Sequence, residues 1–218
     1  MTNIMKNLVK WNDSTTQSVF SKFPALLNFL DIFKKLNDSI TKKYSVPDYY
    51  IADLAKTAPR EHLPRRCYCY KEALGPVEDQ KGLYIFWEKE KSNMFYVGKT
   101  GKDEKAQKGC DVFYKSSGGS GRIPHHIAGG ERVLFREAFR EKPSTASEKY
   151  YDYINKFYVL CIAINGGQHF DENLTLWEKY LILSLLPSQN KEVRLKVSDF
   201  KINNNNQPYL YNFEEWLS

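Results

Sequence analysis

Two segments rich in aromatic and β-branched residues, separated by a short polar stretch, constrain the fold of this chain most strongly. The first is residues 82–87 (GLYIFW) and the second is residues 94–98 (MFYVG), with polar residues 88–93 between them. Segments of this composition are typical of β-strands. Because a connection this short joins antiparallel neighbours, the pair predicts a β-hairpin.

The hairpin predicts a pair of tyrosines on one face of the sheet. If the turn centres on Glu90, Tyr84 lies opposite Tyr96 and Gly82 lies opposite Gly98. The two hydroxyl groups would then lie close together, and each neighbouring glycine would open space for a ligand. The competing interpretation is that tyrosine is simply common in strands, and for either tyrosine alone that interpretation is the stronger one.

Other segments add strands and helices around the hairpin. The apolar run 157–164 predicts a central buried strand. The periodicity of residues 131–141 and 174–186 predicts two helices, the second ending at Pro187. The polar stretch 99–121 predicts a long loop.

The first 80 residues are expected to form a helical extension. Apolar residues recur with mostly helical spacing over 19–33, interrupted by Pro24, and residues 47–56 predict a second helix with proline in its first turn. Residues 57–80 are expected to be irregular. The whole pattern indicates an α+β fold, a small, mostly antiparallel three-stranded sheet flanked by helices.

The chain therefore divides into three expected regions. Residues 1–80 form the N-terminal helical extension, residues 81–190 form the core, and residues 191–218 form a C-terminal tail. An asparagine run at 203–206 predicts a loop, and the aromatic residues of 209–217 are expected to dock on the core.

Composition and the pattern of apolar residues argue against a membrane-spanning or a secreted chain. The chain has 218 residues, 42% hydrophobic and 15% aromatic, which is enough to form a globular core. No apolar run approaches the roughly 20 residues of a membrane span, and the N-terminus lacks the pattern of a signal peptide. We therefore expect a soluble, cytoplasmic protein that does not insert into a membrane.

Charge and cysteine content are weaker indicators. The formal net charge is +6, which suits a polyanionic partner but is shared by many soluble proteins. The four cysteines show no CxxC pair, so reduced cysteines are favoured over a zinc site.

Glu178 lies within or beside an apolar helical stripe. At helical offsets its neighbours are Leu174, Leu181, Ile182 and Leu185. A carboxylate buried there needs a cation or hydrogen bonds to compensate its charge. The alternative is a glutamate at the edge of the stripe that reaches solvent or pairs with lysine.

Residues 121–126 (GRIPHH) contain a second candidate group. Arg122 and His126 are four residues apart and share a face if a helical turn forms, which Pro124 tolerates in the first turn. The alternative is a basic surface loop flanked by glycine.

These residues together resemble the GIY-YIG nuclease superfamily. Residues 82–84 (GLY) and 96–99 (YVGK) are similar to its two-part signature, separated by eleven residues. Residues 176–182 (LWEKYLI) look like its glutamate-bearing helix. Residues 186–190 (LPSQN) look like the Pro-x-x-Asn segment that follows that helix in the family. The resemblance covers about residues 81–190.

The chain departs from the family at the catalytic arginine. Many members carry it within about ten residues of the second motif, but all basic residues at 99–121 here are lysines. Arg122 comes next, and its Arg-x-x-x-His spacing with His126 after an inserted loop resembles the restriction endonucleases of the superfamily. Arg132 and Arg136 are the alternatives.

The resemblance implies roles for the metal and the phenols. Glu178 would hold a single Mg²⁺ or Mn²⁺, hard cations that prefer oxygen ligands. Tyr84 would activate or position the attacking water, and nearby Lys99, Arg122 and the metal would favour its phenolate. Tyr96 would orient the phosphate or the water.

It also implies roles for the basic residues. Arg122 would neutralise charge in the transition state, and His126 would shuttle the proton or contact phosphate. Lys99 would hold the electrostatics of the site. The lysines of the long loop (Lys102, Lys105, Lys108 and Lys115) are more simply read as solvated than as contacts to DNA.

By resemblance, the expected function is that of a divalent-metal-dependent DNA endonuclease, a hydrolase of phosphodiester bonds. A type II restriction-like enzyme acting on double-stranded DNA is favoured, and a two-fold symmetric recognition site would imply a homodimer. The alternatives are a repair, recombination or homing-type nuclease of the same superfamily, and a catalytically degenerate module that binds nucleic acid. A helical interaction protein is the weakest alternative.

Overall fold

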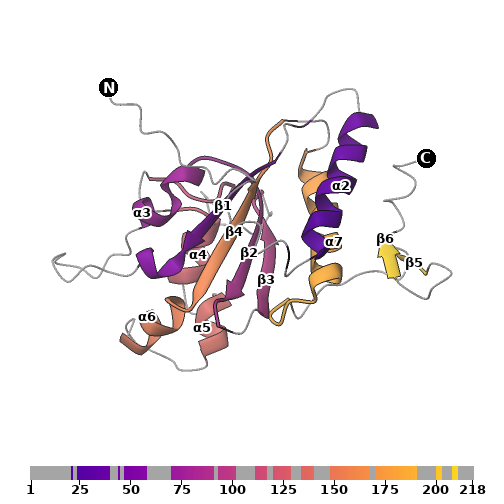
Figure 1. Ribbon diagram of the computed structural model, residues 1–218. Coiled ribbons are helices and arrows are strands. Elements are labelled where there is room, and N and C mark those ends of the chain that lie inside the picture. The colour runs from indigo at the N-terminus through magenta and orange to yellow at the C-terminus, as the bar shows by residue number, and fades with distance from the viewer. Residues whose placement is uncertain are drawn as a thin grey trace, which may run out of the picture.

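A computed structural model of the chain defines the fold (Figure 1). It describes residues 21, 24–39, 44, 47–57, 70–90, 93–101, 111–116, 120–128, 134–139, 148–166, 170–190, 200–202 and 208–210. In chain order the elements are α2 (Pro24–Ser39), β1 (Asp48–Asp53), the 3-10 helix η1 (Leu54–Thr57), α3 (Tyr70–Leu74), the 3-10 helix η2 (Gly75–Val77), β2 (Gly82–Glu88), β3 (Asn93–Lys99), α4 (Arg122–Ala128), α5 (Leu134–Phe139), α6 (Glu148–Ile154), β4 (Phe157–Ala163), α7 (Phe170–Leu185), β5 (Phe200–Ile202) and β6 (Pro208–Leu210).

The fold is α+β, as expected, but its main sheet has four strands and not three. The strand order is β1-β4-β2-β3, and every neighbouring pair is antiparallel. The run predicted as a central strand is β4, which lies between β1 and β2. β5 and β6 form a separate two-stranded ribbon.

The additional strand, β1, lies where a helix was expected over residues 47–56. It pairs with β4 from Asp48 opposite Ala163 to Asp53 opposite Tyr158. Without β1, the buried strand β4 would present a row of unpaired backbone groups along one edge. A helix of ten residues is marginal by itself, so pairing with β4 overrides the local preference.

Helices cover both faces of the sheet (Figure 1). Alternate residues of β2 point to opposite faces: Leu83 and Ile85 pack with α2 and α7, whereas Tyr84 and Phe86 pack with α3, α4, α5 and α6. β2 is therefore buried on both faces, which explains its continuous apolar sequence.

The N-terminal part of the chain contributes to this common core. Phe33 of α2 packs against Trp177 of α7, with ring centroids 5.2 Å apart. Asn173 of α7 donates a buried hydrogen bond of 2.6 Å to the hydroxyl of Tyr44. The predicted helical extension thus includes a strand of the main sheet and a helix that packs on α7.

The register of the β2–β3 hairpin differs from the expected one. Tyr84 lies opposite Gly98, and Tyr96 lies opposite Phe86, with a bulge between Phe86 and Trp87. The prediction of Tyr84 opposite Tyr96 is therefore wrong by two positions. Because side chains alternate with a period of two, a shift of two keeps both tyrosines on one face.

Some of the predicted helices are confirmed and others are not. Those over 131–141 and 174–186 are confirmed by α5 and α7, and α2 begins at Pro24, where the expected helix was interrupted. Residues 57–80, expected to be irregular, include α3 and η2, and α6 was not predicted.

Some predictions fall wholly or partly outside the described residues. The asparagine loop at 203–206 lies outside, and only residues 209–210 of the aromatic segment 209–217 are described, so docking of that segment stays a prediction. Within the described part of the chain, no helix combines the length and the apolar character that crossing a membrane would require.

Candidate active site

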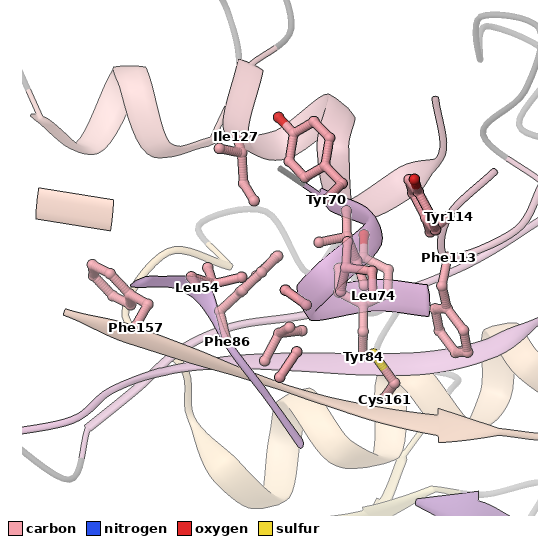
Figure 2. Packing of buried hydrophobic residues seen from close by; sticks show 14 of the residues in the cluster. Leu54, Tyr70, Leu74, Tyr84, Phe86, Phe113, Tyr114, Ile127, Phe157 and Cys161 are labelled. Carbon is pink, nitrogen blue, oxygen red and sulfur yellow. The ribbon is translucent and has the colours of Figure 1, made fainter. Parts of the chain in front are cut away.

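Tyr84 is the centre of the candidate site. Its ring is completely buried on β2 and lies against the ring of Tyr96, with centroids 6.2 Å apart. Figure 2 shows Tyr84 among the hydrophobic side chains of its face, with Cys161 close by. The expected pair of phenols on one face is therefore present, although the two rings are diagonal neighbours and not directly opposed.

The glycines of the two strands make room for protein and not for a ligand. A Cβ atom at Gly98 would lie 2.4 Å from the hydroxyl oxygen of Tyr84 and 2.8 Å from Cε1 of Tyr96. A Cβ atom at Gly82 would lie 1.9 Å from the carbonyl oxygen of Ile162 on β4. The expectation that these glycines open space for a ligand is wrong, because the phenols and the neighbouring strand fill that space.

Arg122 and His126 lie on α4, so of the two alternatives for this segment the helical turn is the one that forms. Arg122 is its first residue and Pro124 stands in the first turn. Gly121 precedes the helix with a φ of +131°, and a Cβ atom there would lie 2.6 Å from the carbonyl oxygen of Phe113. Glycine at this position lets α4 start directly against the loop before it.

His126 connects α4 to Tyr84. Its Nε2 atom lies 2.6 Å from the Tyr84 hydroxyl, and its ring centroid lies 5.2 Å from that of Tyr96. Burial, the Arg122 guanidinium and neighbouring His125 lower the pKa of His126 to about 3. His126 is therefore neutral near neutral pH, and one of its ring nitrogens can accept a proton.

The phenols of Tyr84 and Tyr96 keep their protons. Burial raises the pKa of Tyr84 well above its ordinary value, and the charge of Glu178 adds to this effect. Arg122 acts in the opposite direction, through its charge and a hydrogen bond, but burial outweighs it. The pKa of Tyr96 is likewise raised, mainly by burial and then by Glu178. The expectation of a favoured Tyr84 phenolate is not met by the protein groups alone.

Glu178 reaches the site around the edge of the sheet. Its helix α7 packs on the face opposite Tyr84, through the buried residues Leu174, Trp177 and Leu181. β3 is the edge strand, and the backbone N–H of Lys99 at its end donates to the Glu178 carboxylate. The carboxylate therefore lies at the edge where the two faces meet, close enough to influence both phenols.

Burial of Glu178 makes its ionisation unfavourable. Burial raises the pKa of Glu178 to about 7, although the charges of Lys99 and Arg122 and the Lys99 N–H lower it. Leu174 and Leu181 are buried while Ile182 and Leu185 are partly buried, as expected for an apolar stripe, and the Glu178 side chain at that stripe is itself partly exposed. A carboxylate with this pKa is ready to exchange its proton for a cation near neutral pH.

The segment after α7 covers the free edge of β3. The Asn190 side chain accepts from the Val97 N–H at 2.9 Å and donates to the Val97 carbonyl at 2.8 Å. The backbone N–H groups of Ser188 and Gln189 donate to the carbonyls of Met94 and Phe95. The Pro-x-x-Asn segment thus fixes the same strand edge that holds Glu178.

No protein-family model, curated protein or solved structure matches this chain.

Among the site residues described above, Glu178 offers the carboxylate oxygens that could hold a hard divalent cation, with water and substrate as its further ligands. In the described part of the chain, no group of three or more His, Cys, Asp and Glu side chains could hold a metal ion. Magnesium commonly binds through one or two carboxylates while keeping water and substrate phosphate as further ligands. Glu178 would be the protein ligand of such an ion.

Two residues at the site were not found from the sequence. Thr100 is completely buried, and its Oγ1 atom accepts from the Gly82 N–H at 2.9 Å, which ties the outer ends of β2 and β3 together. His125 is partly exposed on α4, and its ring centroid lies 6.3 Å from that of His126. Their positions next to Lys99 and His126 in the chain were the available signals.

The remaining candidate residues lie elsewhere or outside the described residues. Arg136 is on α5, but its side chain is not described, and Arg132 is outside the described residues. Lys115 forms an ion pair with Asp111 at 3.5 Å, and the other loop lysines fall outside. Cys161 is a buried free thiol, and the other cysteines are also outside.

Proposed function

We propose that this chain is a divalent-metal-dependent DNA endonuclease related to the GIY-YIG nucleases. The observation that carries the proposal is the meeting of two phenols, an arginine, a histidine and a carboxylate at one edge of the sheet. They come from β2, β3, α4 and α7, which lie far apart in the sequence. Residues that serve packing alone have no need to gather such polar groups around a completely buried phenol.

The first requirement of phosphodiester hydrolysis is an activated water. Tyr84 is buried, so in this proposal the water reaches it past Tyr96 and Arg122, which are both partly exposed. The water donates a hydrogen bond to the Tyr84 oxygen, while Tyr84 donates to the neutral Nε2 atom of His126. In this proposal the water's proton passes through the Tyr84 hydroxyl toward His126 as the new P–O bond forms, so the resting protein needs no free phenolate. Because the pKa of His126 is about 3, the proton must leave His126 at once.

The second requirement is stabilisation of the negative charge that grows on the phosphate. Arg122 offers forked N–H donors and a permanent charge beside Tyr84. The Lys99 ammonium contributes a second positive charge near Glu178. When bound at Glu178, Mg²⁺ or Mn²⁺ supplies charge that polarises the scissile phosphate and stabilises the departing 3′ oxygen.

We favour duplex DNA as the substrate and a restriction-like role. The support is the Arg122 and His126 pair on α4, which follows a long insertion after β3. Recognition of a sequence in duplex DNA needs surfaces that read base edges, and the compact site alone does not supply them. The N-terminal elements, the tail or a second copy of the chain would provide these surfaces.

The test is incubation of the protein with supercoiled plasmid and genomic DNA, with and without Mg²⁺. Metal-dependent cleavage into discrete fragments supports the restriction role, whereas cleavage confined to flaps, nicks or lesions supports a repair role. The Glu178→Gln variant should lose cleavage by about 100-fold or more while retaining DNA affinity. Glu172→Gln, an exposed position near the start of the same helix, is the matched control.

A wild-type protein that binds DNA but never cuts it would contradict the nuclease proposal. Complete burial of the Tyr84 ring gives this outcome a physical basis, because the resting phenol does not meet water. A binding module would then be the function, and its affinity would fall steeply with salt as phosphate contacts release counterions.

A further inference from the structure

The proposed reaction leaves a proton in a buried place. One O–H bond of water breaks as oxygen binds phosphorus, and that proton passes through Tyr84 to His126. The P–O3′ bond breaks at the same centre, and the 3′ oxygen takes its proton from solvent water. Tyr84 is completely buried and His126 is 8% exposed, so His126 needs a route for its proton before the next turnover.

His125 is placed to provide that route. Arg122, His125 and His126 lie on one face of α4, at helical offsets of three and four residues. The His125 and His126 rings lie edge to face with centroids 6.3 Å apart, and His125 is partly exposed to solvent. We propose that His125 is a relay residue that carries the proton from His126 to solvent, an inference that rests on the proposed nuclease function.

The charges around the two imidazoles favour transfer in this direction. Tyr84 and Tyr96 face His126 as neutral phenols, and Arg122 disfavours a positive charge on both imidazoles. Burial lowers the pKa of His126 to about 3, which makes its protonated form a strong acid. The pKa of His125 is also lowered by burial and Arg122, but a partly exposed ring loses less solvation.

Tyr96 is the competing exit, because its ring also contacts Tyr84 and His126. Its pKa is raised, so its hydroxyl keeps its own proton. A neutral phenol also holds a second proton poorly, because its protonated form is a very strong acid. It also lies on the side from which we expect the phosphate to approach. His125 has a ring nitrogen that accepts a proton in the neutral state and returns it to solvent.

The test compares His125→Ala and His125→Gln with wild type in single-turnover cleavage of plasmid DNA. We expect both variants to cleave at least about tenfold more slowly, within the range of acid–base effects. Added imidazole should restore most of the rate of His125→Ala and leave wild type unchanged, because a small base replaces the missing ring. Substituted imidazoles of different pKa should restore it to different extents.

A second measurement does not depend on cleavage. The ring N–H proton of His126 and the Tyr84 hydroxyl proton should exchange with solvent several-fold more slowly in His125→Ala, as measured by NMR. Added imidazole should restore this exchange as well. Circular dichroism checks that both variants keep the helical content of wild type.

Four results would overturn the inference, three of them in the cleavage assay and the fourth in the exchange measurement. The first is an unchanged rate in both variants, and the second is a loss that imidazole does not restore. The third is a changed KM and salt dependence with an unchanged chemical step, which would make His125 a phosphate contact. If wild type itself cleaves no DNA with Mg²⁺, the nuclease proposal fails, whereas normal exchange in His125→Ala removes the relay alone.

Discussion

Glu178 illustrates how one residue combines a benefit for chemistry with a penalty for stability. Its pKa is raised to about 7 because burial outweighs the help from Lys99 and Arg122. In the folded state it therefore prefers to be protonated over a pH range in which the unfolded chain is ionised. The stability that this group contributes is fully present below its ordinary pKa of 4.5 and is lost as the pH rises through 7.

We therefore expect Glu178→Gln to stabilise the metal-free protein at pH 8 and to have little effect at pH 4.5. A carboxamide has no charge to desolvate, so the substitution removes the cost of ionising the buried carboxyl group. From the raised pKa of that group, the gain at pH 8 should be roughly 1–3 kcal/mol. Urea unfolding at the two pH values measures the difference. Glu172→Gln is measured beside it as the exposed control on the same helix, and an equal gain of Glu178→Gln at both pH values would contradict the expectation.

Gly98 provides a second prediction at the scale of single residues. Gly98→Ala places a Cβ atom 2.4 Å from the Tyr84 hydroxyl oxygen, in a site without spare room. We expect a loss of about 1–3 kcal/mol, as for other overpacked sites, together with a displaced phenol. Thermal unfolding and near-ultraviolet circular dichroism measure both effects.

Gly75→Ala is the matched control for this substitution. Gly75 has no heavy atom within 4 Å of its added Cβ atom. Its stability should stay within about 0.5 kcal/mol of wild type. Equal losses in the two variants would show that the crowding at Tyr84 is not the cause.

At the scale of elements, the edge of β3 decides the geometry of the site. Three devices cover this edge: the Glu178 carboxylate at Lys99, the Asn190 side chain at Val97, and backbone hydrogen bonds from residues 188–189. An unprotected edge strand would be open to pairing with another chain. The same contacts that protect the edge therefore hold the carboxylate beside the phenols.

We expect Asn190→Ala to loosen this edge. It removes two hydrogen bonds to Val97, so the loss of stability should be about 1–2 kcal/mol. Hydrogen exchange of the Val97 amide should accelerate by about tenfold, because a loss of about 1.4 kcal/mol in the free energy of opening corresponds to a factor of ten. Ser188→Ala is the control, because Ser188 acts through its backbone N–H. Unchanged exchange at Val97 in Asn190→Ala would argue against the clamp.

For the whole molecule, the N-terminal part of the chain is a component of the core. α2 buries Leu26, Phe29 and Phe33 against α7, and β1 pairs with β4 from Tyr158 to Ala163. The position of α7, and with it that of Glu178, therefore depends on residues far from the motifs. Trp177, next to Glu178, packs edge to face against Phe33 and Tyr44.

Removal of residues 1–57 should therefore abolish folding of the remaining chain. The truncation exposes the β4 edge and the apolar face of α7, which favours aggregation over a stable domain. Circular dichroism and urea unfolding of the truncated protein are the measurements. A soluble fragment with a cooperative transition would show that the core folds without α2 and β1.

Local pattern in the sequence was sufficient for those features that depend on neighbours in the chain. Alternation and composition predicted the β2–β3 hairpin and β4, and helical periodicity predicted α7 with its apolar stripe around Glu178. The spacing of Arg122 and His126 allowed a common face if a helical turn formed, and α4 supplies that turn. Each is a property of residues close together in the chain, for which periodicity is a direct consequence of backbone geometry.

Tertiary structure alone decided the rest. Residues 48–53 became a strand because β4 had a free edge, and a bulge after Phe86 set a register that no turn residue specified. Burial by distant elements keeps the Tyr84 phenol protonated and raises the pKa of Glu178. Strand pairing and the removal of water are properties of groups brought together from far along the chain, so local pattern has no means to encode them.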